Sequence, residues 1–354
     1  MNKIWSTILR KLTAFPHTLR ALGKGVFAES KHIFKKWFFV AYNLIKIMVP
    51  VLILIKIVDQ LGGITILGIA LNPVMELFSL PGAMGIVWAS GIFINIQSAM
   101  AAYIVLAEHY PLTQAQVTLL MSFSLIVHSL PVEQQIAYKI GMRWLVNLAI
   151  RVAIGLIYTY LLMHFYQFFN LLQGVADYSL IERLIVPVAG EKTILLWVWE
   201  TVKILASIVG VIFVLVVLIR LMELGGILEW LEVHLARLLF PLGIGKKFAS
   251  IASIGFIMGL SYGGAFIIDD VKQRPLNAYA DRQVFLLMTL LINLHGVFED
   301  TLLMLTVGAH ISGFLIGRIF FVVVFVYALK YLIFNVSDHT FYRYYFLKRN
   351  ISRE

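Results

Sequence analysis

Cysteine is absent from all 354 residues, and charged residues make up only 14% of the chain. The lack of cysteine excludes disulfide bonds, thiolate metal sites and cysteine nucleophiles. The shortage of charge, with a hydrophobic share of 60% and a mean hydropathy of +0.89, excludes an ordinary soluble domain, which is about half apolar and about a quarter charged. Lipid is the solvent that such a composition requires, so we expect an all-α polytopic membrane protein.

The basic residues concentrate at the two ends of the chain. Residues 1–37 hold eight Lys or Arg against one acid, and residues 330–354 hold five against two, within a net charge of +10. Because basic segments beside membrane spans stay cytoplasmic, we expect both termini inside a bacterial cell, a multi-pass protein of the inner membrane and no nucleic-acid partner. Apolar residues from Ile4 to Leu12 recur at helical spacing beside basic ones, which predicts an amphipathic helix on the membrane surface.

Long apolar runs divide the chain into two halves. Crossing about 30 Å of hydrocarbon takes about 20 helical residues, and several runs approach or exceed that length. The runs are 37–58, 83–107, 111–132 and 144–168 in the first half, and 194–219, 248–268, 283–298 and 301–329 in the second. The stretch 64–80 contains proline and is too broken to span alone.

The two halves repeat one pattern. QVTLLMSFSLIVH ends at His128, and QVFLLMTLLINLH ends at His295, 167 residues later. The same offset relates Gly141 to Gly308, and LGGI occurs in both halves with an offset of 163. Polar identities that hold one register over this length indicate a duplicated unit. The expected organisation is a basic amphipathic segment at 1–36, a first repeat at 37–168, a linker at 169–192, a second repeat at 193–335 and a basic tail at 336–354.

The charges of two equivalent loops indicate how the repeats are related. The loop at 58–82 carries two acids and no base, whereas the loop at 220–247 carries four bases against three acids. If basic loops stay inside, these loops face opposite sides of the membrane and the repeats are inverted. A parallel duplication is the alternative.

Several motifs resemble those of a known family. The two LGGI motifs, the turns LFSLPG and LFPLGIG, and the segment HGVFEDTLLMLTVGAHISGFLIGR resemble nucleoside-recognition (Gate) domains. Such domains occur in spore-maturation membrane proteins, in the membrane part of the ferrous-iron transporter B and, distantly, in concentrative nucleoside transporters. The resemblance covers roughly residues 40–170 and 195–335. It implies two Gate repeats with broken or re-entrant helices and a role in transport, without fixing a substrate.

Histidines and acids stand at matching places in the two halves. His128 is the first residue of HSLPVE and His295 is the first residue of HGVFED, two segments where we expect the helix to break. Each histidine could bind substrate, exchange a proton, ligate a metal or simply pack. Glu133 follows the first histidine, and Glu299 and Asp300 follow the second, as substrate-binding candidates or as helix caps.

Two arginines and two uncharged spans complete the candidates. Arg151 and Arg318 lie inside apolar helices, so we expect each to form a structural ion pair with these acids, an anion clamp being the alternative. The spans GIFINIQSAMAA and GFIMGLSYGGAF suit either close helix packing or unwound segments that line a cavity. Their substrate-binding candidates are Asn95, Gln97, Ser98, Ser261, Tyr262 and Gly263.

These features favour a secondary transporter that works by alternating access. We expect a small polar or anionic organic solute to bind near the bilayer midplane, where the two histidine breaks and the two uncharged spans converge. No nucleotide-binding motif is present and we expect no cofactor, so transport would be driven by a gradient of a coupling ion, H⁺ or Na⁺, or by a partner. The expected partners are the lipid bilayer and the substrate, and a homodimer is left open. A divalent-metal transporter, an intramembrane enzyme or lipid-handling protein, and a non-transporting assembly partner are the alternatives.

Overall fold

The computed structural model describes residues 63–177, 194–224, 237–249 and 277–348 continuously, with single residues or short stretches at 33–61, 234–235 and 251–271. The predicted amphipathic helix at 4–12 lies outside the described residues, as does most of the predicted linker. The described part is helical, and its extended contacts are two isolated bridges, Thr113 with Val175 and Met142 with Phe346.

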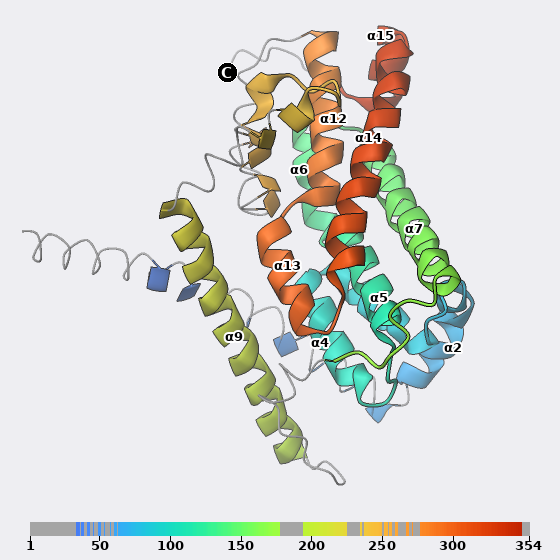
Figure 1. Ribbon diagram of the computed structural model, residues 1–354, viewed down its shortest axis with the longest axis vertical. Helices are drawn as coiled ribbons and strands as arrows, with labels where there is room; N and C mark the ends of the chain where they lie inside the picture. Colours follow the sequence, from blue (N-terminus) through green and yellow to red (C-terminus); the bar gives the residue numbers. More distant parts are fainter. Residues whose placement is uncertain are drawn as a thin grey trace, which may run out of the picture.

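The helices follow the two halves of the sequence (Figure 1). The first half holds α2 (Gly63–Glu76), η1 (Gly82–Met84), α3 (Gly85–Phe93), α4 (Ile96–Ala107), α5 (Gln114–Val127), α6 (Leu130–Ile140) and α7 (Trp144–Phe168). The second half holds α9 (Ile194–Leu224), η2 (Lys246–Phe248), α12 (Ala278–Leu294), α13 (Val297–Thr306), the π-helix η3 (Ser312–Gly317) and α14 (Arg318–Asn335). The chain then closes with α15 (Asp338–Thr340) and the π-helix η4 (Phe341–Tyr345).

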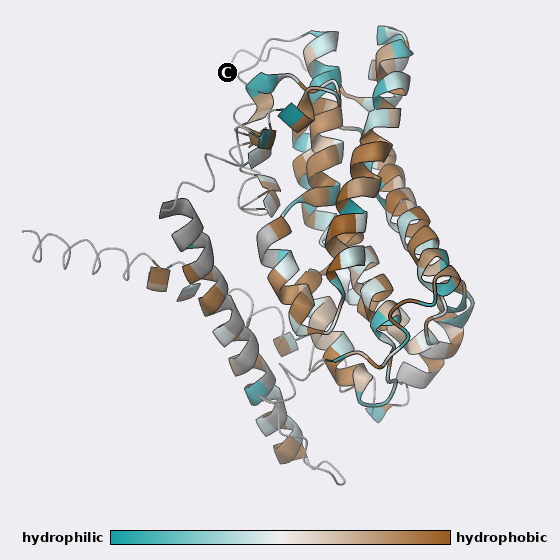
Figure 2. Ribbon diagram, in the orientation of Figure 1, coloured by the Kyte–Doolittle hydropathy of each residue, from teal (hydrophilic) through white to brown (hydrophobic). Residues whose placement is uncertain are grey.

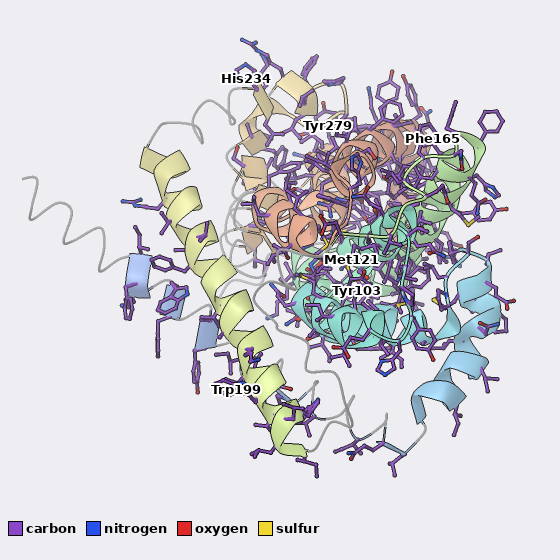
Figure 3. The ribbon with its side chains drawn as sticks, turned by 60° about the horizontal axis from the view of Figure 1, so that its bottom comes forward. Tyr103, Met121, Phe165, Trp199, His234 and Tyr279 are labelled. Carbon is purple, nitrogen blue, oxygen red and sulfur yellow. The ribbon has the colours of Figure 1, made fainter. Side chains whose placement is uncertain are left out.

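Within the described residues, three helical segments are long and apolar enough to cross a membrane: Gln114–Ile140, Trp144–Phe168 and Ser312–Asn335. The second of these matches the run predicted at 144–168. Apolar colour covers the outside of α7 and α14 (Figure 2). Figure 3 places Met121 and Tyr103 within the bundle and Phe165 at its edge, in accord with their burial. The apolar residues therefore form the outer surface of the bundle as well as its core, as expected for a protein that faces lipid.

Several predicted runs are broken inside the bundle. The run at 83–107 is interrupted between α3 and α4, where Asn95 is extended and its Oδ1 accepts a 2.8 Å hydrogen bond from the Ser98 N–H. The runs ending near His128 and His295 break at those residues, as the sequence predicts. The run at 301–329 is also interrupted, which the sequence did not predict. Gly308 adopts φ +81°, a left-handed conformation that interrupts the helix between the end of α13 and Ser312. Glycine also suits this place because a Cβ would lie 2.8 Å from the Asp177 carbonyl oxygen.

Left-handed backbone residues recur at matching positions in the two halves. Ser129 and Gly296, each directly after a histidine, have φ +51° and +62°. Ser79 and Gly243, which are 164 residues apart, have φ +55° and +76° and sit in turns with the same hydrogen-bond pattern. The duplicated sequence thus produces a duplicated backbone, broken at the same points.

The equivalent helices α5–α6 and α12–α13 run in opposite directions. The start of α5 lies where α13 finishes, since the Gln114 side chain donates to the Gly308 carbonyl at 3.4 Å. The start of α12 lies where α14 finishes, since Arg282 donates to the Ile333 carbonyl at 2.8 Å. In Figure 1, α5 and α6 ascend while α12 and α13 descend, so their breaks meet midway.

Candidate functional site

The two helix breaks bring two histidines together. His128 ends α5 and His295 ends α12, each with ψ near 165° that turns the chain out of its helix. Their rings face one another with the two Nε2 atoms 3.1 Å apart, and both residues are buried. Each Nδ1 lies 3.1–3.2 Å from two carbonyl oxygens of the helix that the histidine ends. These carbonyls lack intrahelical donors because the helix stops there.

Glu133 supplies a carboxylate to both histidines. It lies in the first turn of α6 and is 1% exposed. Its Oε1 is 3.0 Å from the Nε2 of His295 and 3.6 Å from the Nε2 of His128. A carboxylate in the first turn also stabilises the amino end of α6 electrostatically. Glu133 can therefore stabilise this helix end and take part in binding at the same time.

Arg151 fixes this arrangement from α7. Its Nη2 lies 2.7 Å from Glu133 Oε2, which is the ion pair that the repeat register predicts. The same side chain donates from Nε to the Ile126 carbonyl at 2.6 Å and from Nη2 to the His128 carbonyl at 2.7 Å. The guanidinium therefore caps the exposed carbonyl end of α5 while it neutralises Glu133. An anion clamp would need these donors, so the geometry favours the ion pair.

The second half is not a copy of this arrangement. Arg318 opens α14 and is buried, and Asp300 is the acid whose charge acts most strongly on it. Asp300 folds back over the start of α13, where a Cβ on Gly296 would lie 3.0 Å from Asp300 Oδ2. The Nε and Nη1 of Arg318 have no hydrogen-bond partner among the described residues. The side chain of Glu299 lies outside them. The carboxylate that lies 3.0 Å from His295 is Glu133, from the opposite half.

The two uncharged spans approach the same point. Ser129, just after His128, donates its N–H to the Gly91 carbonyl at 2.9 Å and its hydroxyl to the Ile94 carbonyl at 3.2 Å. In the second half, Gly259 has φ +72°, and a Cβ there would lie 3.7 Å from His295 Cδ2. The candidates Ser261, Tyr262 and Gly263 lie outside the described residues.

The three predicted binding residues of the first uncharged span, Asn95, Gln97 and Ser98, differ in their surroundings. Asn95 serves as the amino cap of α4, Ser98 is buried, and Gln97 is half-buried. Asn95 is therefore engaged in the helix break rather than directed at the histidines. The break places the Gly91 and Ile94 carbonyls against Ser129, the residue after His128.

A second polar group, which sequence reasoning missed, joins α7 to the π-helix η3. Tyr158 donates to the Gly313 carbonyl at 2.5 Å, and the Tyr166 hydroxyl lies 2.8 Å from Ser312 Oγ. The His310 N–H donates to Thr118 Oγ1 at 2.9 Å. The glycines of SGFLIG, set between polar groups, were the available signal for an irregular helix here.

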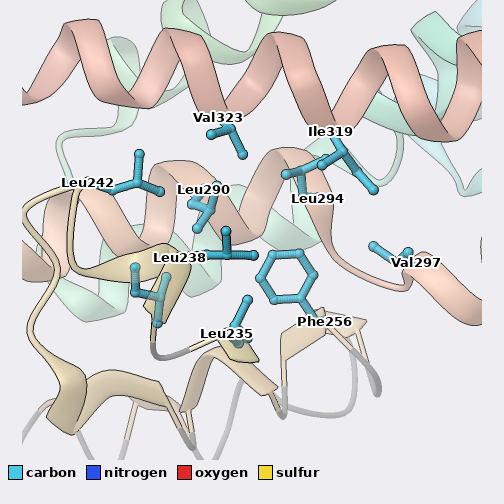
Figure 4. A pocket seen from close by; sticks show the side chains of 10 residues that line it. Leu235, Leu238, Leu242, Phe256, Leu290, Leu294, Val297, Ile319 and Val323 are labelled. Carbon is cyan, nitrogen blue, oxygen red and sulfur yellow. The ribbon is translucent and has the colours of Figure 1, made fainter. Parts of the chain in front are cut away.

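A pocket of about 180 Å³ lies beside the histidine pair but is entirely apolar (Figure 4). Leu294 and Val297, which flank the His295 break, line it together with Phe256 and Leu290. At the corresponding place in the first half, Trp88 stacks on Phe123 with ring centroids 3.8 Å apart. The second half has Ala252 and Leu290 at these positions, so the repeat leaves a hollow where the first half has two rings.

Three side chains of the site could hold a metal ion. One ligand atom from each of His128, Glu133 and His295 lies within 4.8 Å of the others, and all three residues are buried. Two imidazole nitrogens and one carboxylate oxygen form a donor set that suits first-row divalent ions.

The apolar exterior, the broken helices and the buried polar centre define a helical membrane protein. Residues 41–143 match the Gate family, described as nucleoside recognition, in the stretch that ends just after α6. This confirms the family resemblance predicted from the motifs. The chain is also similar to the uncharacterized membrane protein YvoD of Bacillus subtilis (strain 168), with 25% identity over 286 residues, 78% of this chain and 86% of the relative. No solved structure matches the chain.

Proposed function

We propose that the protein is a secondary transporter built from two inverted repeats, which alternately open a central site to each side of the bacterial inner membrane. The observation that carries the proposal is the contact between His128 and His295. These residues end equivalent helices that arrive from opposite directions, and they meet at one buried point. Transporters with inverted repeats place their sites where broken helices of the two repeats meet.

The burial of His128, Glu133 and His295 argues against a purely structural role for these polar side chains. Polar groups inside a membrane bundle persist where they are paired or where they serve a substrate or ion path. Arg151 and Glu133 neutralise one another, but the two Nε2 atoms face each other and a carboxylate oxygen. Their position between the repeats makes them accessible whenever one repeat moves against the other.

The polarity of the site favours a cation over an anion. The expected solute was polar or anionic, and an anion would need free cationic donors. The Nε and Nη2 of Arg151 already bond protein oxygens, while its Nη1 and the Nε and Nη1 of Arg318 have no partner among the described residues. The atoms that converge between the histidines are acceptors, and these favour a cation. We propose that a cation binds here, either as the transported substrate or as the coupling ion. On this proposal the protein is not an enzyme and needs no cofactor, and both termini are cytoplasmic.

Transport itself is tested in liposomes that contain the purified full-length chain. Charge movement across the reconstituted membrane is recorded while H⁺, Na⁺ and divalent-cation gradients are imposed in turn. We expect a current with at least one gradient, and its loss in His295→Gln. His164→Gln, which alters an exposed histidine of α7, is the matched control and keeps the current. Currents equal in the wild type and His295→Gln would overturn the assignment of the site.

The inverted relation is tested by labelling equivalent turns. Glu76 and Phe240 are both exposed and lie 164 residues apart in the duplicated pattern. Because the chain contains no cysteine, a single cysteine at either position is the only thiol. We expect a membrane-impermeant maleimide to label Glu76→Cys and Phe240→Cys from opposite faces of oriented vesicles. Labelling of both from one face would instead establish a parallel duplication.

A further inference from the structure

We infer that His128, His295 and Glu133 form a binding site for a divalent first-row transition-metal ion. The inference rests on the coordination geometry, and it deepens the proposed function by naming the class of cation that the central site takes. Three independent features support it: the tautomers that the histidines must adopt, the triangle formed by the three ligand atoms, and the groups that hold those ligands in place.

The surroundings of the histidines fix which nitrogen carries hydrogen. Among the described residues, the hydrogen-bond partners of each Nδ1 are carbonyl oxygens, those of Ser124 and Leu125 for His128 and those of Leu291 and Ile292 for His295. A carbonyl oxygen only accepts, so both Nδ1 atoms must donate. In the neutral rings both Nε2 atoms are then lone-pair acceptors, and they point toward each other and toward a carboxylate oxygen.

Three acceptors at such short distances require a positive centre between them. The two Nε2 atoms are 3.1 Å apart, and Glu133 Oε1 lies 3.0 Å from one and 3.6 Å from the other. A point about 1.9 Å from all three atoms lies at the centre of this triangle, so an ion slightly above the plane reaches each at about 2.0–2.1 Å, the usual Zn–N and Zn–O distance. The ligand–metal–ligand angles there are about 90–120°, which four- and six-coordinate ions accept.

A proton satisfies the same atoms less well. If His295 carried a proton on Nε2, its two acceptors would lie in directions about 70° apart, so a bond aimed between them would bend about 35° from each. If it pointed directly at Glu133, the His128 lone pair would face no donor. A metal ion bonds all three without moving them.

The surrounding groups have the arrangement of an outer coordination shell. In metal sites the ligating histidine donates its other N–H to a carbonyl or carboxylate, and the ligating carboxylate is itself hydrogen-bonded. Both histidines donate to helix-end carbonyls, and Glu133 Oε2 is held by Arg151 at 2.7 Å. The ligands come from α5, α6 and α12, so the metal joins the two halves.

The donor set also decides the kind of ion and the strength of binding. Imidazole ligands favour Zn²⁺, Fe²⁺ or Co²⁺ over Mg²⁺ and Ca²⁺, and the absence of cysteine removes the soft thiolates that would hold Cu⁺. Three protein ligands leave at least one position open to water, as in exchangeable sites. Arg151 offsets the charge of Glu133, which weakens attraction for the ion and suits an ion that must leave again.

The site is tested on the purified full-length protein in detergent. After incubation with Zn²⁺ or Co²⁺ and gel filtration, we expect about one equivalent of metal per chain in the wild type and in His164→Gln. His128→Gln and His295→Gln should each lose the bound metal. Because a substitution here could impair folding, the His295→Cys variant provides a second readout. With Co²⁺ it should show a thiolate-to-cobalt charge-transfer absorption that the wild type, lacking cysteine, cannot give.

The outcomes separate this inference from the proposed function. Absence of metal from the wild type, or metal retained equally in both histidine variants, would overturn the metal site. If the liposome currents persisted in that case, the transporter assignment would stand and the histidines would hold a proton instead. Stoichiometric binding without uptake of Zn²⁺ or Co²⁺ into liposomes carrying a metal-sensitive dye would support the site and overturn metal as the cargo.

Discussion

The repeat offers a direct comparison between two buried arginines, Arg151 and Arg318. Both are fully buried and both belong to apolar helices, but their surroundings differ. Arg151 bonds Glu133 and the carbonyls of Ile126 and His128, whereas the Nε and Nη1 of Arg318 have no partner within the described residues. Replacing each arginine by methionine keeps much of the side-chain volume and removes the charge.

Arg151→Met should be the more damaging change. It leaves the Glu133 carboxylate buried without its cation, and breaking a buried pair in this way lowers the free energy of unfolding by about 3–5 kcal/mol. It also removes two charge-assisted hydrogen bonds to carbonyls at the end of α5, each of which contributes about 1.5–3 kcal/mol, although these effects overlap. Arg318→Met removes fewer hydrogen bonds among the described residues, so we expect it to cost at least about 2 kcal/mol less.

The assay is reversible unfolding in mixed micelles, followed by the fluorescence of the seven tryptophans. EDTA is present throughout, so that no bound metal contributes to stability. Glu133→Gln, Arg151→Met and the double variant complete a cycle, for which we expect a coupling free energy of about 2 kcal/mol or more. If the single effects were additive to within about 0.5 kcal/mol, or if Arg318→Met cost as much as Arg151→Met, the described role of Arg151 would be wrong.

Two further substitutions test the packing around the site. Gly313→Ala should lower the free energy of unfolding by about 1–3 kcal/mol, because its Cβ would lie 2.4 Å from Thr118 Cγ2 and 2.6 Å from the Tyr166 hydroxyl. Gly174→Ala, where a Cβ meets nothing within 4 Å, is the control, and equal effects of the two would contradict this packing. Leu290→Phe, which places in the second half the ring present in the first, should fill part of the apolar pocket and raise the free energy of unfolding by about 0.5–2 kcal/mol. A loss of stability measured in the same micelles would show that the pocket cannot accept the ring.

Sequence reasoning predicted the elements whose signal lies within one stretch of chain. The bounds of α7 followed from a long apolar run that holds Arg151 as its one charged residue. The breaks at His128 and His295 followed from the turn-forming and polar residues after each histidine. The pairing of Arg151 with Glu133 followed from matched spacing and from the instability of a lone guanidinium in an apolar helix.

Features that depend on how the two halves cross were not predictable in the same way. The 3.1 Å approach of the histidines depends on the crossing of α5 and α12, and no local pattern records that geometry. The break after Thr306 was missed because the residues from 301 to 329 are almost uniformly apolar, and only Gly308 marks the left-handed turn. Equal roles for Glu133 and Asp300 followed from symmetry, but the carboxylate of the first half contacts the histidine of the second.

This crossed contact has a consequence for the proposed transport cycle. Arg151 ties the end of α5 to Glu133 of α6, and it does so from α7, so these three helices are bonded into one body around His128. His295 follows α12, in the second half. In the site, its contacts with that body are those of its Nε2 atom with His128 and Glu133. Under the proposed function, movement of the second half against the first would separate His295 from the other two ligands while leaving the Arg151 contacts intact. The complete three-ligand site would then exist only in the closed arrangement, and either proposed opening movement would reduce it to the two ligands of the first half. An ion bound by all three groups stabilises the closed state, and the loss of one ligand on opening is the physical step that would release it.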